Sequence, residues 1–204
     1  MTRIVAISGS RRDGSTTRAA LRVALDAAAD AGADTGLIDL GKVDLPLYHP
    51  DEDAQGESER LTRLVREADG VLAGSPVYRG SYSSTFKNFH DFCGSDEYAN
   101  TAVGLLATAG GGSYGGTLEH LRSTFRNVHT WTVPHEVGIS GASRVVDTDG
   151  IRDDDLRART EKLGRVVVEH AERLRECAND RRLRTRNPPP FCPPLTYGDY
   201  DRTG

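Results

Sequence analysis

A loop rich in hydroxyl and arginine side chains stands near the start of the chain, at residues 8–17 with the sequence SGSRRDGSTT. A β-branched run at residues 4–7 precedes it, and an alanine-rich stretch with helical spacing follows it. The first N–H groups of a helix lack intrahelical partners and carry a partial positive charge, so a helix that begins here favours a bound anion. The hydroxyls and guanidinium groups supply further donors. The loop therefore predicts a phosphate-binding site.

The spacing of the glycines separates the classes of phosphate ligand. Gly9 and Gly14 have the spacing of a triphosphate-binding Walker A loop, but Ser15 occupies the position of its lysine. The dinucleotide pattern Gly-x-Gly-x-x-Gly fails as well, because Arg11 stands where its second glycine is required. A monophosphate held by hydroxyls, backbone N–H groups and an arginine remains. The alternative is that Ser15 or Thr16 only caps the helix while the arginines are solvated.

Two further loops of small residues follow predicted strands. Residues 75–88, SPVYRGSYSSTFKN, include Pro76, which fixes the exit from the strand, and Tyr78, whose ring can lie beside a flat ligand. Residues 108–116, TAGGGSYGG, are rich in glycine, which permits close approach of the backbone to a ligand. The alternative for the glycine loop is a flexible surface turn. Together with the phosphate loop, these loops predict a site for a flat phosphorylated heterocycle.

Apolar runs alternate with helical patterns along most of the chain. Strands are predicted at residues 4–7, 36–40, 70–75, 102–108 and 130–133, the last continuing past Pro134 to Val137 or Ile139, with helices between them and a long helix over residues 156–174. This alternation indicates an α/β fold, with a doubly wound five-stranded parallel sheet between two layers of helices. In the strand order 2-1-3-4-5, the loops after strands one, three and four lie side by side at the carboxyl edge, where such sheets bind ligands. Because the first helix buries a stripe of alanines, we expect its backbone to lie close to the sheet.

Composition excludes several classes of protein. The chain has 204 residues, of which 37% are hydrophobic and 27% charged, as in soluble globular proteins. A net charge of -4 gives no support for a nucleic-acid partner. No stretch approaches the ~18 apolar residues of a membrane span, and the start lacks the apolar region of a signal peptide. Cys93, Cys177 and Cys192 form neither a disulfide framework nor a metal motif. We therefore expect a cytoplasmic protein with no membrane or nucleic-acid partner.

The C-terminal end differs in composition from the rest. Five of the nine prolines lie among its last residues, and helical periodicity is expected to end at Asp180. We predict a folded, ligand-binding domain at residues 1–179 and a proline-rich tail at residues 180–204 that is either disordered or draped over a neighbouring subunit.

In this combination of loops, the chain resembles the NADPH-dependent FMN reductase family of flavodoxin-like proteins. The matching pieces are the loop from Ser8 to Thr17, Pro76-Val77-Tyr78 with Lys87, Asn88 and Asp91, and the glycine loop after the fourth strand. They occur in order over roughly residues 3–170, and together they are much more specific than any one alone. The resemblance implies a flavodoxin-like fold, FMN bound noncovalently at the sheet edge, and a homodimer or homotetramer with partner residues near the flavin.

The resemblance also implies which residues bind FMN. Ser10, Arg11, Ser15, Thr16 and Thr17 would hold the phosphate; Pro76, Val77, Tyr78 and Arg79 would lie along the isoalloxazine; and Gly110, Gly111 and Gly112 would approach its pyrimidine side. Ser8, Arg12, Gly80 and Thr108 complete the candidate set. The sequence does not distinguish which of the two arginines faces the ligand.

The implied reaction passes hydride from NADPH or NADH to the flavin and then electrons to a small-molecule acceptor such as free FMN or a quinone. It needs no side-chain acid or base, so we assign no catalytic residue; Arg79 either contacts a nicotinamide phosphate or is solvated. The alternative is a flavodoxin-type electron carrier without turnover of its own. Such carriers usually flank the flavin with aromatic rings, whereas Trp131 is expected to pack in the core. His135-Glu136 lacks a second histidine at helical spacing, so we expect no metal, and Cys93 is expected to be a buried apolar residue.

Overall fold

The computed structural model describes residues 1–53 and 55–186. Its centre is a five-stranded sheet in the order β2-β1-β3-β4-β5, and every neighbouring pair is parallel. The strands are β1 (Arg3–Ser8), β2 (Asp34–Asp39), β3 (Gly70–Pro76), β4 (Ala102–Thr108) and β5 (Trp131–Ile139). The predicted fold class and strand order are confirmed. Pro134 lies within β5, an edge strand, where a missing backbone donor is tolerated.

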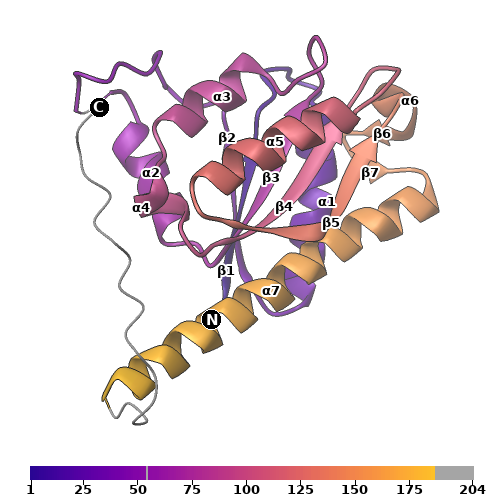
Figure 1. Cartoon of the computed structure of the whole chain (residues 1–204). Helices are drawn as coiled ribbons and strands as arrows, with labels where there is room; N and C mark the ends of the chain where they lie inside the picture. The colour runs from indigo at the N-terminus through magenta and orange to yellow at the C-terminus, as the bar shows by residue number, and fades with distance from the viewer. Residues whose placement is uncertain (54, 187–204) are drawn as a thin grey trace.

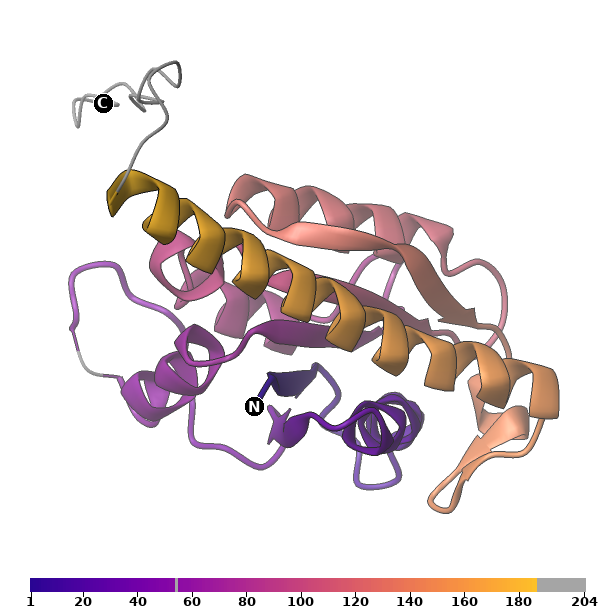
Figure 2. The ribbon, with the colours of Figure 1, turned by 90° about the horizontal axis from the view of Figure 1, so that it is seen from below.

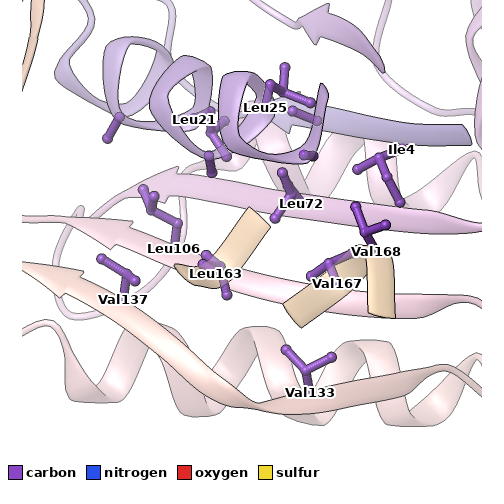
Figure 3. Close-up of a cluster of buried hydrophobic side chains, with 14 of the residues drawn as sticks. Ile4, Leu21, Leu25, Leu72, Leu106, Val133, Val137, Leu163, Val167 and Val168 are labelled. Carbon is purple, nitrogen blue, oxygen red and sulfur yellow. The ribbon is translucent and has the colours of Figure 1, made fainter. Parts of the chain in front are cut away.

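Helices cover both faces of the sheet and make the three layers (Figures 1 and 2). One face carries α1 (Thr16–Asp30) and α7 (Asp154–Arg186), and the other carries α2 (Ser58–Arg66), α3 (Ser84–Asp91), α4 (Ser95–Tyr98) and α5 (Gly115–Asn127). Each face has its own core. Aliphatic side chains from α1, α7 and the sheet fill the first core, as Figure 3 shows for Leu21, Leu72 and Val167. The second core is more aromatic and includes Phe86 and Phe125.

Helices α1 and α7 pack with their backbones almost in contact. A Cβ atom placed on Gly164 of α7 would lie 2.0 Å from the carbonyl oxygen of Ala24 in α1. The alanine stripe of α1 is buried, as expected, and it brings the helix close to α7 as well as to the sheet. Small residues on both helices therefore set the thickness of this layer.

Between β5 and α7 the chain forms small elements that no pattern in the sequence predicts. They are α6 (Ala142–Val145) and an antiparallel pair, β6 (Val146–Asp147) and β7 (Gly150–Ile151). Arg152 forms an ion pair with Asp147, with 2.6 Å between nitrogen and oxygen. A strand of two residues is too short to show the alternation of apolar and polar residues by which a strand is predicted.

Two expectations about the C-terminal half are corrected. Trp131 is 60% exposed rather than packed in the core, because it is the first residue of an edge strand. Helix α7 continues past Asp180 to Arg186, since the residues there are good helix formers and the prolines begin only at Pro188. The tail beyond residue 186 lies outside the described residues, so the division of the chain into domain and tail stays a prediction. Within the described ranges, every helix is too short or too polar to cross a bilayer.

Candidate functional site at the carboxyl edge of the sheet

The loops after β1, β3 and β4 meet around a cavity of about 330 Å³ at the carboxyl edge of the sheet. Its volume lies within the ordinary range of small-molecule sites. The predicted site residues that line it are Ser10, Arg12, Thr16, Thr17, Pro76, Val77, Tyr78, Thr108 and Gly110. Gly14, Ala109, Ala142 and Ser143 line it as well and were not predicted. All three predicted loops contribute residues to the cavity lining, whereas Ala142 and Ser143 come from α6, which no pattern in the sequence predicts.

The remaining predicted residues lie around the cavity without lining it. They are Ser8, Arg11, Ser15, Arg79, Gly80, Gly111 and Gly112. Ser8 and Ser15 are buried beneath the phosphate loop, and Ser15 has a structural task there. Its hydroxyl caps α1 by accepting a hydrogen bond from the Arg18 backbone N–H at 3.1 Å. Ser15 is thus the N-cap residue of α1, whereas Thr16 lines the cavity.

The two adjacent arginines of the phosphate loop face different spaces. Arg12 lines the central cavity, whereas Arg11 lines a separate cavity of about 280 Å³ together with Leu40 and Leu47. Ser10 accepts a hydrogen bond from the Arg12 backbone N–H at 3.4 Å, which shapes the turn between them. Of the two arginines, Arg12 is therefore the one that lines the central cavity.

An ion pair beneath the phosphate loop holds its shape. Arg18 of α1 and Asp39 at the end of β2 approach to 2.8 Å, and their side chains are only 14% and 16% exposed. Arg18 also donates to the carbonyl oxygen of Asp13 within the loop. Lys42 contacts the Asp13 carboxylate from outside, and its hydrogen bond lowers the pKa of that carboxyl. The loop is thus anchored to β2 through Arg18, a residue that sequence reasoning missed.

Serine hydroxyls connect the second loop to the first. Ser83 donates from its hydroxyl to the Gly9 carbonyl oxygen at 2.6 Å and caps α3 by accepting from the Phe86 N–H at 3.1 Å. The Ser83 N–H in turn donates to the Ser75 hydroxyl at 2.9 Å. A Cβ on Gly9 would lie 2.8 Å from the Cβ of Phe86, so only glycine fits this crossing. Two loops that are distant in sequence therefore form one rigid wall.

A pair of threonine side chains forms part of the cavity wall. Thr17 of α1 and Thr108 of β4 are both buried, and their hydroxyl oxygens are 2.5 Å apart. Helix α1 follows β1, and β4 lies two positions from β1 in the sheet. The bond therefore joins the start of α1 to the end of β4. It fixes the distance between the phosphate loop and the glycine loop.

The glycine loop rests on β5. The ring of Tyr114 packs on Gly138, where a Cβ atom would lie 1.9 Å from the ring. The Ser140 hydroxyl donates to the Gly112 carbonyl oxygen at 3.1 Å, and the Ala142 N–H donates to the Ala109 carbonyl oxygen at 2.8 Å. These contacts hold the loop at Ala109, Gly112 and Tyr114, although residues 110–113 are exposed.

The donor set of the cavity suits binding rather than acid–base chemistry. The described lining residues offer hydroxyls, backbone N–H groups, one guanidinium and the half-exposed ring of Tyr78, but no carboxylate, imidazole or thiol. Hydroxyls and an arginine at the start of α1 match a phosphate group. A proline, a valine and an aromatic ring match a flat heterocycle. This set fits FMN, whose two ends have these two chemistries.

A second, larger cavity of about 660 Å³ lies at the C-terminal ends of α3 and α5. Burial lowers the pKa of His90 on its wall to about 4 and raises that of the Cys93 thiol. Cys93 is thus a buried apolar residue, as expected. The described residues contain no cluster of three or more side chains arranged to hold a metal ion.

Comparisons with known proteins agree on one family. The sequence profile described as "NADPH-dependent FMN reductase" matches residues 2–144. A Bacillus protein named "NADPH azoreductase" is 32% identical over 143 residues, covering 68% of this chain and 77% of the relative. A Pseudomonas aeruginosa protein named as an NAD(P)H-dependent FMN reductase is 31% identical over 184 residues, covering 85% of this chain and 97% of the relative.

Solved structures agree on the fold. The flavoenzyme NAD(P)H:(acceptor) oxidoreductase of Paracoccus denitrificans superposes with a TM-score of 0.70 at 21% identity, covering 85% of this chain and 98% of that one. An archaeal flavodoxin superposes with a TM-score of 0.62 at 12% identity, covering 84% and 99%. The fold is therefore flavodoxin-like, as the sequence predicts.

Proposed function

The chain belongs to the NADPH-dependent FMN reductase family, and from this premise we propose that FMN binds in the cavity at the carboxyl edge of the sheet. The protein is an enzyme, an FMN-dependent NAD(P)H oxidoreductase. One observation carries the placement of the cofactor: three loops with phosphate-binding and ring-binding chemistry converge on one cavity.

The ends of the cavity suggest an orientation for FMN. The phosphate lies at the start of α1, where Ser10, Arg12 and Thr16 line the cavity and the first backbone N–H groups of the helix are free of intrahelical bonds. The isoalloxazine lies along Val77 and Tyr78, with the glycine loop on its other side. Thr17 and Thr108 already bond to each other, so we assign them to the support of the site and not to a strong contact.

The reaction divides between cofactor and protein. When bound, FMN supplies the two-electron hydride chemistry. The chain holds and orients it: Arg12 and the helix terminus fix one end, and Pro76, Val77 and Tyr78 fix the plane of the other. Backbone N–H groups of the glycine loop would stabilise negative charge that develops on the ring. Because half of the Tyr78 surface is exposed, one side of the site is open to a second substrate.

The electron acceptor is proposed to be a small molecule that enters from this open side after the oxidised dinucleotide has left. Relatives are named as FMN reductases and as azoreductases, so free FMN, quinones and azo compounds are the classes to test. The flavodoxin-type carrier is less well supported. Tyr78 is the single aromatic residue among the described lining residues. Trp131 is the first residue of β5 and therefore lies at the amino end of the strands, away from the cavity.

Assembly and location complete the proposal. The exposed Trp131 on an edge strand, and Leu47 at 83% exposure, support a homodimer or homotetramer. The free thiols of Cys93 and Cys177 support a reducing, cytoplasmic setting. Size-exclusion chromatography with light scattering measures the first, and a monomeric mass at micromolar concentration contradicts it.

Two measurements test the function. We expect FMN to lose fluorescence when it is titrated with the purified protein, and the wild type to oxidise NADPH or NADH faster when FMN and an acceptor are present. Binding of FMN without any NAD(P)H turnover supports the carrier instead. The lack of any change in FMN fluorescence contradicts both.

A further inference from the structure

Arg79 adopts a backbone conformation that arginine normally avoids. Its φ is +53°, in the left-handed region, and it is followed by Gly80 at +83°. The N–H of Tyr78 donates to the carbonyl oxygen of Ser81 at 2.9 Å, and the N–H of Ser81 donates back to Tyr78 at 3.1 Å. Residues 78–81 thus form a two-residue hairpin with positive φ at both central positions, where glycine, asparagine and aspartate are favoured. Gly80 follows this preference and Arg79 does not.

The hairpin is held from outside, so the strain is not relieved by movement. The Ser81 hydroxyl and the Nδ1 atom of His120 in α5 are 2.9 Å apart, and the rings of Tyr82 and His120 meet edge to face at 6.4 Å. The backbone of Gly116 lies so close that a Cβ there would be 3.0 Å from the Gly80 carbonyl oxygen. Strained residues that the surroundings hold in place occur preferentially at ligand sites.

The charge of Arg79 is not used within the described structure. Its side chain is exposed, and it takes part in none of the ion pairs found among residues 1–53 and 55–186. The residue before it, Tyr78, lines the cavity on its open side. Arg12, the one charged lining residue, stands at the phosphate loop on the other side. A guanidinium on a fixed turn is therefore carried by the residue next to Tyr78, on the side of the cavity that the proposed function leaves open to a second substrate.

We propose that Arg79 binds a phosphate group of the NAD(P)H co-substrate. The inference rests on the proposed function, in which FMN occupies the phosphate loop and leaves the Tyr78 side open. A dinucleotide carries a pyrophosphate, and NADPH carries a 2′-phosphate as well; the planar guanidinium binds either group through two hydrogen bonds. Arginine is kept at the strained position because glycine, which fits the turn better, cannot make this contact.

The substitution Arg79→Gly separates binding from stability. We expect the KM for the dinucleotide to rise about 10- to 100-fold, as for the loss of a hydrogen-bonded charge, with kcat changed less than about twofold. The melting temperature should rise, because glycine relieves the turn. The affinity for FMN and the KM for 1-benzyl-1,4-dihydronicotinamide, a hydride donor without phosphate, should stay unchanged.

Two further variants serve as controls. Arg79→Lys keeps the charge but loses the planar pair of donors, and its KM should lie between those of wild type and Arg79→Gly. His129 has φ +61° at the amino edge of the sheet, outside the central cavity. His129→Gly should raise the melting temperature similarly without changing any KM.

The two dinucleotides identify the group that is bound. If Arg79→Gly raises the KM for NADPH alone, Arg79 binds the 2′-phosphate. If it raises the KM for NADH equally, Arg79 binds the pyrophosphate. Unchanged KM values for both overturn the inference, as does an equal rise for the benzyl compound. Failure of the wild type to oxidise either dinucleotide overturns the proposed function and this inference with it, whereas wild-type turnover with an unaffected Arg79→Gly overturns the inference alone.

Discussion

Arg11 and Arg12 are adjacent in sequence but face different cavities, which gives a matched pair of substitutions. Arg12→Ala should weaken FMN binding about tenfold or more, because a charge-assisted hydrogen bond to the phosphate is lost. Arg11→Ala should leave the affinity within about twofold of wild type. Fluorescence titration measures both constants. Riboflavin, which lacks the phosphate, should bind both variants as it binds the wild type; an equal loss for riboflavin contradicts the assignment of Arg12.

His90 gives the folded protein a dependence on pH that is separate from the site. Its ring is 8% exposed and contacts Phe86, Tyr98 and Phe125, and this burial lowers its pKa from 6.5 to about 4, with Lys87 acting in the same direction. Because the unfolded chain binds the proton near pH 6.5, it holds more protons than the folded state between about pH 6.5 and 4. The free energy of unfolding therefore falls as pH falls through this window, by roughly 3 kcal/mol at its lower end.

Urea unfolding at pH 7 and pH 4.5 checks this prediction on the wild type and His90→Phe. The phenylalanine keeps the stacked contact with Phe86, whose ring lies 6.3 Å away, but carries no titratable group. The variant should lose less stability on acidification than the wild type. Equal losses in the two proteins contradict the role of His90.

Single residues could be predicted where the backbone dictates the choice. The residue types of the loop glycines, Pro76 and the hydroxyl side chains indicate their roles in the loops, because no other residue types fill these roles as well. The burial of Trp131 could not be predicted correctly. An apolar residue at the start of a strand gives the same sequence pattern whether the strand is central or at the edge of the sheet. Arg18 and Asp39 are 21 positions apart, and nothing local marks them as partners.

At the scale of elements, the Arg18–Asp39 pair ties α1 to β2 beneath the phosphate loop. Asp39→Asn keeps the size of the side chain but removes the charge that holds Arg18. We expect FMN affinity to fall severalfold with little change for riboflavin, because the loop loses its shape only at the phosphate end. Isothermal titration with both ligands measures the difference.

Asp34 on the same strand supplies the control. It pairs with Arg3 at 3.2 Å, but the two side chains are 54% and 42% exposed, so this pair contributes little. Asp34→Asn should leave both affinities unchanged. Equal effects of the two substitutions would show that charge on β2, and not the buried pair, matters for the loop.

Elements were predictable to the extent that their periodicity was long. The five strands and the long helices have clear patterns, and the right-handed connection of parallel strands limits their order to a few topologies, of which the predicted order is the one observed. The β6-β7 pair and α6 are too short to give a pattern, so Ala142 and Ser143 were absent from the predicted site. The end of α7 was missed because helix formers between residues 180 and 186 lack an apolar face.

For the whole molecule, the contact between α1 and α7 joins the first and last helices of the domain. Gly164→Ala places a Cβ 2.0 Å from the Ala24 carbonyl oxygen, so the helices must separate and the aliphatic core must repack. The free energy of unfolding should fall by about 1–3 kcal/mol. Gly36→Ala in β2, whose Cβ would meet Val5 at an ordinary 3.9 Å, should cause no comparable loss. Urea unfolding of both variants checks this; equal stabilities contradict the close packing.

The same contact has a consequence for synthesis on the ribosome. Helix α1 leaves the exit tunnel early, yet its buried face is completed by Leu163, Val167 and Val168 of α7, which are made near the end of translation (Figure 3). The second core needs only residues up to Val128 and can close while the chain is still attached to the ribosome. The nascent protein therefore carries one finished and one open face of its sheet, and chaperones that bind exposed aliphatic segments have their target on the α1 side until α7 arrives.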